Sequence, residues 1–294
     1  MRIFVTGAAG HVGSTIADLL AQEHDIVALW RESPCRARPR VQALRGTLGD
    51  PEFVEQVTRD AQPCDAIVHS AASISMDLTS TSVSRTNCIG TQQILQLACK
   101  WQVQSVVYIS SAQVIGAPRV HPVTEDHPAF PQTSYHASKL FGEHLMALAT
   151  GDGLHAVSLR LTSPIGPGMR SDRIFSVFIR HAAANRELVV AGQGTRRQDY
   201  IDVRDVARAV QAALEARVPS GVFQIGRGES ISNSELARIC VRVLGSSSQI
   251  RFSGTDSQEG VVWDISIARA RSALGFEPAV SLEQTILEMA RGCP

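Results

Sequence analysis

The segment SYHASK places a tyrosine, Tyr135, four residues before a lysine, Lys139, within a helical pattern. Residues four apart share one face of a helix, so the phenol and the ammonium could lie close together. A free tyrosine has a pKa of about 10 and is a poor base at neutral pH. A neighbouring ammonium stabilises the phenolate, and such a pair could therefore move protons in a reaction. The alternative is two amphipathic side chains on an ordinary surface helix.

A second candidate is the segment VTGAAGHVGS, in which Gly7, Gly10 and Gly13 lie between an apolar segment and a helical pattern. That context indicates a dinucleotide-binding turn. Gly7 would allow the tight turn, Gly10 the close approach of a diphosphate, and Gly13 the packing of helix on strand. The amino terminus of the helix would meet the phosphates with free N–H groups. The alternative is a glycine-rich connector without a ligand.

A sheet must position these residues, and the hydrophobic pattern predicts one. Short apolar segments alternate with helical patterns through the first two-thirds of the chain, which is typical of an α/β doubly wound parallel (Rossmann) sheet with helices on both faces. The predicted strands are 2–7, 25–30, 66–71, 105–110 and 155–161, and the predicted helices are 11–22, 50–61, 86–101 and 135–150.

The regular alternation of apolar segments and helical patterns stops after residue 162, where a Pro/Gly loop begins. We expect residues 1–165 to form the dinucleotide-binding domain and the chain to return to its sheet within 198–226. A smaller C-terminal substrate lobe is expected from 166–197 and 227–294. Helices are predicted in it at 174–185, 232–245 and 281–292, the last two with Ser caps, and a strand at 187–192.

Composition excludes several classes of function. The 294 residues carry 28 basic and 28 acidic side chains, so we expect neither nucleic acid nor a membrane surface as a partner. No apolar run could cross a bilayer, and the chain starts in a strand-like segment, so no signal peptide is expected. Six scattered cysteines form no CxxC pair and no zinc spacing, which favours a metal-free protein in the reducing cytoplasm.

The glycine spacing of three and three resembles that of short-chain dehydrogenases/reductases, especially their extended branch, the NAD-dependent epimerase/dehydratase family. Seven further segments resemble motifs of that family in the right order. They are CDAIVHSAAS (64–73), TNCIGTQQIL (86–95), YISSAQVIG (108–116), YHASK (135–139), RLTSPIGPG (160–168), QDYIDVRDVARAV (198–210) and DISIARARSALGFEP (264–278).

The resemblance implies a catalytic trio of Ser111, Tyr135 and Lys139. Tyr135 would be the acid/base, Lys139 would stabilise its phenolate and hold the nicotinamide ribose, and Ser111 would bind the reacting oxygen. Ser110 is the alternative serine, and a relative that has lost catalysis is the alternative for the trio. The implied cofactor-binding residues are Gly7, Gly10, His11, Val12, Gly13, Arg31, Leu48, Ala71, Ala72, Asn87, Tyr135, Lys139 and Thr162.

The residues after Ser111 bear on the reaction. Family members that remove water carry an Asp–Glu pair there, and decarboxylating members carry a Glu, whereas this chain has Ala112 and Gln113. The resemblance therefore favours hydride transfer at a C–O centre of a nucleotide sugar, as a 4-epimerase of the UDP-galactose 4-epimerase type or a 4-ketoreductase. The alternatives are an NADPH-dependent reductase of a non-sugar carbonyl and a non-catalytic NADP(H)-sensing regulator.

The cofactor preference is predicted from the end of the second strand. NAD-preferring members usually carry an Asp where this chain has Trp30, and Arg31 follows. An arginine pairs with the 2′-phosphate of NADP, and Arg36, Arg38 and Arg40 add positive charge. We therefore expect NADP(H) to be favoured over NAD(H). The alternative is a solvated basic loop and a protein that binds NAD without the Asp.

The substrate residues implied are Ser73, Ser111, Ser163, Arg196 and Arg197. Gln198 takes the place of an arginine that often grips the nucleotide diphosphate in this family. Arg196 and Arg197 are close enough to replace it, or else form a basic surface turn. The resemblance also implies a homodimer through the helices at 86–101 and 135–150.

Overall fold

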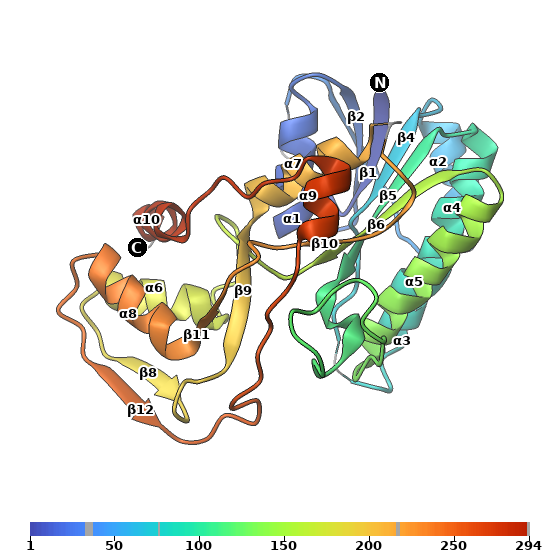
Figure 1. The fold of residues 1–294 in the computed structure, drawn as a ribbon. Coiled ribbons are helices and arrows are strands. Elements are labelled where there is room, and N and C mark those ends of the chain that lie inside the picture. The colour runs from blue at the N-terminus through green and yellow to red at the C-terminus, as the bar shows by residue number, and fades with distance from the viewer. Residues whose placement is uncertain (33–37, 76, 216–217, 293–294) are drawn as a thin grey trace.

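The computed structural model describes residues 1–32, 38–75, 77–215 and 218–292. Its centre is a sheet of seven parallel strands in the order β10-β6-β5-β4-β1-β2-β3 (Figure 1). The bounds are Arg2–Thr6 (β1), Asp25–Trp30 (β2), Val41–Arg45 (β3), Ala66–His69 (β4), Ser105–Ser111 (β5), His155–Leu161 (β6) and Gly221–Ile225 (β10). The predicted doubly wound parallel sheet is confirmed.

The edge strand β3 was not among the predicted strands. Three of its five residues are exposed, so it lacks the continuous apolar run that marks the central strands. The chain returns to the sheet only at β10. The preceding strand β9 (Arg197–Asp202) pairs instead with β7 (Ser163–Ile165) and β11 (Ser230–Ser232), so the return is narrower than the predicted 198–226.

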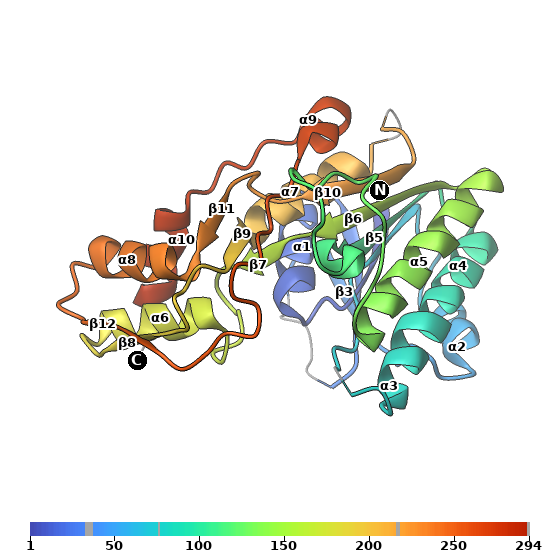
Figure 2. The ribbon, with the colours of Figure 1, turned by 60° about the horizontal axis from the view of Figure 1, so that its bottom comes forward.

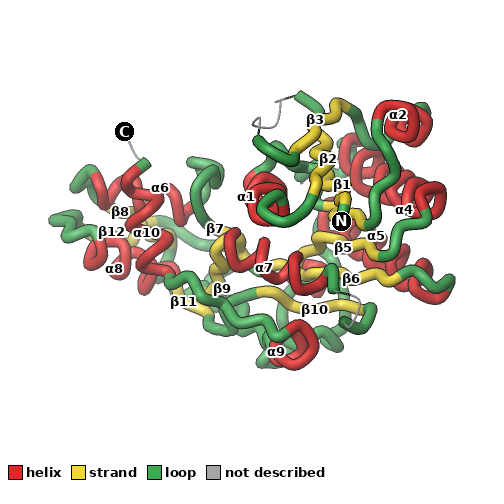
Figure 3. Tube along the Cα trace, turned by 90° about the horizontal axis from the view of Figure 1, so that it is seen from above, coloured by secondary structure: helices red, strands yellow, loops and turns green. Residues whose placement is uncertain are grey.

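Helices cover both faces of the sheet, as Figure 3 shows from above. One face is covered by α1 (His11–Leu20), α7 (Val203–Ala213) and α9 (Ala268–Leu274), and the other by α2 (Phe53–Asp60), α4 (Gly90–Trp101) and α5 (Ser134–Gly151). Each face has its own buried apolar cluster. Residues 265–276 contribute to the first cluster, although the sequence placed them in the lobe.

A third cluster fills the smaller lobe, which lies to one side of the sheet (Figure 2). The lobe contains α6 (Ile174–Ala183), α8 (Asn233–Val243), α10 (Leu282–Arg291) and the paired strands β8 (Leu188–Ala191) and β12 (Ile250–Ser253). Both Ser caps are present. Ser232 and Glu235 form a reciprocal capping box on α8, and Ser281 accepts from the backbone of Gln284 on α10. No helix in the described ranges is both long and apolar enough to span a bilayer.

Candidate functional site

The glycine turn lies where the order of the sheet reverses, between β1 and β4, which is the position at which doubly wound folds bind ligands. Gly7 has a φ of +70°, and a Cβ on it would lie 2.8 Å from the Cα of Ala71. A Cβ on Gly13 would overlap the carbonyl group of Gly7. A Cβ on Gly10 would meet only the Gly7 oxygen among the described residues, at 3.2 Å, so this side of the turn is open. The turn therefore fits a diphosphate lying against the amino terminus of α1.

A buried hydrogen-bond chain supports the turn from below. The hydroxyl of Thr91 donates to the carbonyl oxygen of Asn87 at 2.5 Å, so His69 Nε2 must donate to Thr91 Oγ1 at 3.0 Å. His69 Nδ1 then accepts from Thr6 Oγ1 at 2.7 Å, and Thr6 Oγ1 accepts from the backbone N–H of Ala71 at 3.1 Å. Burial lowers the pKa of His69 to about 3. His69 is therefore a neutral, fully hydrogen-bonded link between β1, β4 and the helix beside them.

Tyr135 and Lys139 lie near the start of α5. Thr133 caps this helix by accepting from the backbone N–H of His136, as expected for an N-cap threonine. Lys139 is only 2% exposed, and its Nζ donates to the carbonyl oxygen of Ile109 at 2.7 Å. Nζ lies 6.0 Å from the ring centroid of Tyr135. Lysines are almost never fully buried without a specific role, so the surface-helix alternative does not hold.

Burial changes the proton affinity of both side chains. It lowers the pKa of Lys139 to about 7, although the Glu143 carboxylate acts in the opposite direction. Burial also raises the pKa of Tyr135 to about 12. The phenol alone is thus protonated at neutral pH. A positive neighbour would favour the phenolate, and Lys139 Nζ lies 6.0 Å from the centroid of the phenol ring.

The two adjacent serines at the end of β5 have different surroundings. Ser110 is buried, and its hydroxyl donates to Glu143 Oε1 at 2.5 Å. Ser111 is half-buried, and its Oγ accepts only a weak 3.3 Å contact from the backbone of Gln113 in the short 3₁₀ helix η2 (Ala112–Ile115). The free hydroxyl at the sheet edge is therefore that of Ser111, which favours it over Ser110.

The Asn87 side chain forms hydrogen bonds that connect its own helical turn with the segment after β4 and with α5. It lies in the π-helical turn η1 (Ser84–Ile89), which follows α3 (Thr81–Val83) and leads into α4. Its Oδ1 accepts from the Ser73 N–H at 2.7 Å, and its Nδ2 donates to the Ser73 carbonyl at 3.0 Å and to Ser138 Oγ at 2.8 Å. Ser138 Oγ in turn donates to the Tyr135 carbonyl at 2.7 Å. The side chain thus fixes the segment after β4 against α5.

The polar residues at the lobe side of the site lie on two opposite faces, because side chains alternate in direction along a strand. Arg196 and Gln198 share a face: with its amide oxygen toward the arginine, Gln198 accepts from Arg196 Nε at 2.9 Å and donates to Ser163 Oγ at 2.7 Å. Arg197 lies on the opposite face, where it pairs with Glu235 at 3.0 Å and donates to Ser230 Oγ at 3.2 Å. The structure therefore brings Ser163 and Arg196 together but not Arg197.

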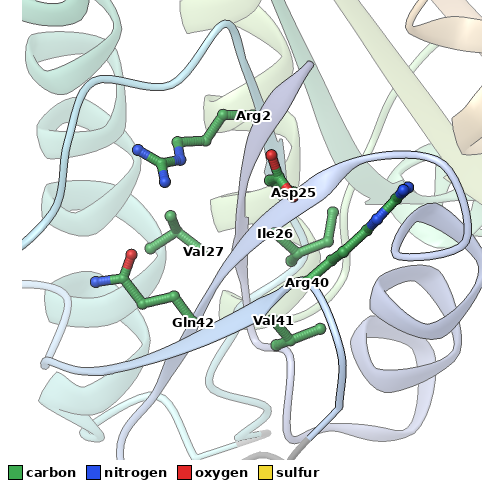
Figure 4. A pocket seen from close by; sticks show the side chains of 7 residues that line it. All are labelled: Arg2, Asp25, Ile26, Val27, Arg40, Val41 and Gln42. Carbon is green, nitrogen blue, oxygen red and sulfur yellow. The ribbon is translucent and has the colours of Figure 1, made fainter.

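A hollow of about 290 Å³ lies at the opposite edge of the sheet, as Figure 4 shows. Its lining comes from the first residues of the strands, among them Arg2, Asp25 and Gln42, and none of the predicted site residues. Arg2 there donates to Gln62 and Arg40 to the carbonyl of Gln22. In the part of the chain that the structure describes, no cluster of three or more His, Cys, Asp or Glu side chains could hold a metal ion.

Residues 3–226 match the model of the NAD dependent epimerase/dehydratase family. The chain belongs to this family. A dTDP-glucose 4,6-dehydratase of Streptomyces niveus is 28% identical over 98% of this chain and 91% of its own length. A UDP-glucose 4-epimerase of Mycolicibacterium smegmatis is 29% identical over 97% and 96%. The solved structure of MoeE5 in complex with UDP-glucose and NAD has 26% identity and a TM-score of 0.85, covering 99% and 98%.

Membership in this family of nicotinamide-dependent enzymes gives the remaining residues their context. Several side chains expected near the cofactor have structural partners in the family fold. Leu48 packs against Gly90, and the Thr162 hydroxyl donates to Asp199 at 3.1 Å, so both side chains have a partner within the protein. His11 is largely buried, with its Nε2 unpaired, and Val12 packs on the first apolar cluster.

Two of the basic residues after β2 form ion pairs with acidic side chains. Exposed Arg31 pairs with Glu32 at 2.8 Å, and Arg38 pairs with Asp18. Arg40 donates to the Gln22 carbonyl at the opposite edge of the sheet, and Arg36 lies outside the described residues.

Three buried residues beside the candidate site were absent from the sequence prediction: Tyr108, Glu143 and Arg160. Glu143 could have been found, because it follows Tyr135 and Lys139 at the same four-residue interval and so shares their helix face. The other two lie on β5 and β6, and only the register of these strands brings them to α5.

Proposed function

We propose that the chain transfers a hydride at a C–O centre of a nucleotide sugar, as a 4-epimerase or a 4-ketoreductase. The observation that carries the proposal is the buried, carbonyl-bound Lys139 beside Tyr135, at the end of the sheet where the glycine turn lies. The names of relatives that match nearly the full chain, a UDP-glucose 4-epimerase and a dTDP-glucose 4,6-dehydratase, support a nucleotide sugar.

Each member of the trio has one task in this proposal. Tyr135 removes or returns the proton of the reacting hydroxyl, and the Lys139 ammonium stabilises its phenolate. Ser111 donates a hydrogen bond to the same oxygen and steadies the charge that develops on it. The bound nicotinamide supplies the hydride acceptor and donor. Gly7, Gly10 and Gly13, with the amino terminus of α1, would hold its diphosphate.

Epimerisation or ketone reduction is favoured over loss of water, in spite of the dehydratase relative. Ala112, which is buried, and Gln113 follow Ser111, and neither carries the carboxylate that an elimination would use to shuttle a second proton. Hydride and single-proton transfer need only the trio.

We further propose that Arg196, aligned by Gln198 and Ser163, holds the diphosphate of the sugar nucleotide. Arg197 is left out of this role because its guanidinium is paired with Glu235. A reductase of a non-sugar carbonyl is the second candidate, because Gln198 supplies no charge at the place where family members often have an arginine. Ser73, whose hydroxyl lies 2.9 Å from that of Ser82, completes the proposed substrate side.

The deciding experiment measures binding and turnover together. UDP-glucose, UDP-galactose and dTDP-glucose are titrated by calorimetry with nicotinamide cofactor present, and epimerised or reduced sugar is followed by NMR. We expect binding in the micromolar range and turnover that falls by at least ~100-fold in Tyr135→Phe. Absence of any nucleotide-sugar binding would eliminate the sugar proposal, and full activity of Tyr135→Phe would eliminate the catalytic assignment.

The preference for NADP(H) over NAD(H) is a further proposal. It is supported by the lack of a carboxylate at Trp30, the last residue of β2, and by Arg31, whose exposed guanidinium pairs with the exposed Glu32. We expect Arg31→Asp to lower NADP affinity at least ~10-fold and leave NAD affinity equal or higher. Arg59→Asp, at the far edge of the sheet, is the matched control. Equal preferences in wild type and Arg31→Asp would defeat the proposal.

We also propose a cytoplasmic homodimer through α4 and α5, which lie side by side in Figures 1 and 2. Phe141 and Leu148 of α5 are exposed, and so is Ile89, the last residue of η1 directly before α4. Sedimentation should show a dimer in wild type and a monomer in Phe141→Glu/Leu148→Glu. Phe252→Glu, an exposed apolar position in the lobe, should leave the dimer intact. A monomeric wild type would refute the proposal.

A further inference from the structure

The ammonium of Lys139 is buried without a carboxylate at its side. Nζ donates to the carbonyl oxygen of Ile109 at 2.7 Å and lies 4.8 Å from the ring centroid of Tyr108. Within the described ranges, no Asp or Glu oxygen lies within 4.0 Å of it. The carbonyl and the ring face are partial negative charges and replace only part of the lost hydration. A further charge is needed if this lysine is to keep its proton.

Glu143 lies one helical turn after Lys139, on the same buried face of α5. Its carboxylate is held in one orientation: Oε1 accepts from Ser110 Oγ at 2.5 Å and from Arg160 Nε at 2.9 Å, and Oε2 accepts from another Arg160 nitrogen at 2.8 Å. The side chains of Glu143 and Arg160 are 4% and 7% exposed. Arg160 is itself fixed by a 3.2 Å hydrogen bond to the Glu125 carbonyl. The pair is therefore a fixed, desolvated set of two charges next to the lysine.

We propose that Glu143 is a positioning residue that holds Lys139 in its ammonium form, and that Arg160 limits this effect by pairing with the same carboxylate. The Glu143 carboxylate then attracts both the Lys139 ammonium and the Arg160 guanidinium. The use of the ammonium in catalysis rests on the proposed function, but the charge of Lys139 can be measured without it.

Among the described residues, the other ionisable groups that surround Lys139 and its neighbouring rings are neutral, which leaves the charges of Glu143 and Arg160 to decide its protonation. His69 on β4 is neutral, because both its ring nitrogens are hydrogen-bonded within the buried chain. The phenols of Tyr108 and Tyr135 and the Cys88 thiol are neutral as well, since burial raises their pKa values. Burial lowers the pKa of Lys139 to about 7, and Glu143 is the group that acts against this decrease.

The composition of the chain makes a direct test possible. It contains only two lysines, Lys139 and Lys100, and Lys100 is exposed on α4. Lysine labelled with ¹³C at Cε therefore gives two resolved side-chain signals, one of which is an internal control. The Lys139 signal is titrated in wild type, Glu143→Gln, Arg160→Met and the double variant, without substrate.

The expected shifts have opposite signs. Glu143→Gln removes the negative charge, so the titration midpoint of Lys139 should fall by about one pH unit. Arg160→Met removes the competing positive charge, so the midpoint should rise, and the double variant should lie between the two single variants. Lys100 should not change. In each variant the pH profile of kcat/KM should move in the same direction as the Lys139 midpoint.

Shifts of the same sign in both single variants, or no shift of Lys139 in Glu143→Gln, would overturn the proposal. If Arg160→Met does not fold, Glu143→Gln decides alone, because glutamine keeps the shape and one acceptor oxygen for Arg160. Glu143→Asp, which keeps the charge, should return the midpoint toward the wild-type value. A shifted midpoint in a protein that turns over no nucleotide sugar would refute the proposed function and leave this inference intact.

Discussion

Gly142 should be intolerant of the smallest substitution, although it lies in the middle of α5. An alanine there normally stabilises a helix by about 0.5–1 kcal/mol relative to glycine. Here, however, a Cβ would overlap Oη and Cζ of Tyr108 and lie 2.8 Å from Cε1. The Tyr108 ring is 1% exposed, and its hydroxyl lies 3.5 Å from the Lys139 carbonyl. A methyl group at position 142 would therefore require this buried ring to shift.

The expected loss follows from these two opposing effects. Forcing extra carbon into a packed core costs about 1–3 kcal/mol, and the helix propensity of alanine offsets part of it. We expect Gly142→Ala to lower the free energy of unfolding by about 1–2 kcal/mol. Activity should also fall, because the displaced ring is the one over which the Lys139 ammonium lies.

The assay is urea unfolding at neutral pH, with the midpoint compared at constant slope. Gly151→Ala is the matched control: it ends the same helix, and a Cβ there would meet nothing within 4 Å. That variant should be as stable as wild type or more stable by up to about 0.5 kcal/mol. If Gly142→Ala were as stable as Gly151→Ala, the proposed overlap with Tyr108 would not exist and the reasoning would be refuted.

Three other predictions concern charge. Lys139→Met should abolish turnover but raise the free energy of unfolding, by about 2 kcal/mol more at pH 6 than at pH 9. The reason is that a lysine with a lowered pKa destabilises the fold most at a pH where it is protonated. Denaturant titrations at both pH values check this, and an equal gain in the free energy of unfolding at both would contradict it. Burial lowers the pKa of His69 to about 3, so only the unfolded chain takes up a proton at this residue between pH 7 and pH 5. The free energy of unfolding of wild type should therefore fall by about 2 kcal/mol over this range relative to that of His69→Gln. Parallel curves of unfolding free energy against pH for the two proteins would contradict this. Arg196→Ala should raise KM for the nucleotide sugar about tenfold, whereas Arg197→Ala should leave KM unchanged and lower the free energy of unfolding by at most about 1 kcal/mol. Steady-state kinetics measure the difference. An equal effect of the two variants on KM would contradict the assignment of the two arginines to opposite faces.

The central strands were predictable because parallel strands buried on both faces are almost continuously apolar, as in Ala66–His69. The edge strand β3 carries no such signal. The helix α7 did carry one, since Asp202 caps it and Val203, Val206 and Val210 follow at helical spacing. The sequence prediction does not include this helix, although the spacing indicates one.

For the site, residue types and spacing were sufficient to bring Ser111, Tyr135 and Lys139 forward as candidates, whose roles stay a prediction, but not to rank their neighbours. Ser110 and Ser111 are equivalent in sequence, and only the position of Glu143 beneath the sheet edge distinguishes them. Arg196 and Arg197 are likewise adjacent arginines, whose faces depend on where β9 begins. Partners from distant strands, such as Arg160, follow from register, which a local pattern does not contain.

The helix α5 combines these features in an unusual distribution of polarity. Its buried face consists largely of polar or small residues, including Ser138, Lys139, Gly142 and Glu143, with Met146 as the one large apolar side chain. Its outer face carries Phe141, 36% exposed, and Leu148, 69% exposed, although a helix packed on a sheet normally buries its apolar side chains against it. Helical stability in proteins comes mainly from the burial of an apolar face. The inner face of α5 holds the buried charges together with Tyr135 and Lys139, and its apolar contacts with the core come from Met146 and the partly buried Leu140. A second copy packed on α4 and α5 would add apolar burial on the outer face, and this would link the proposed dimer to the geometry of Tyr135 and Lys139.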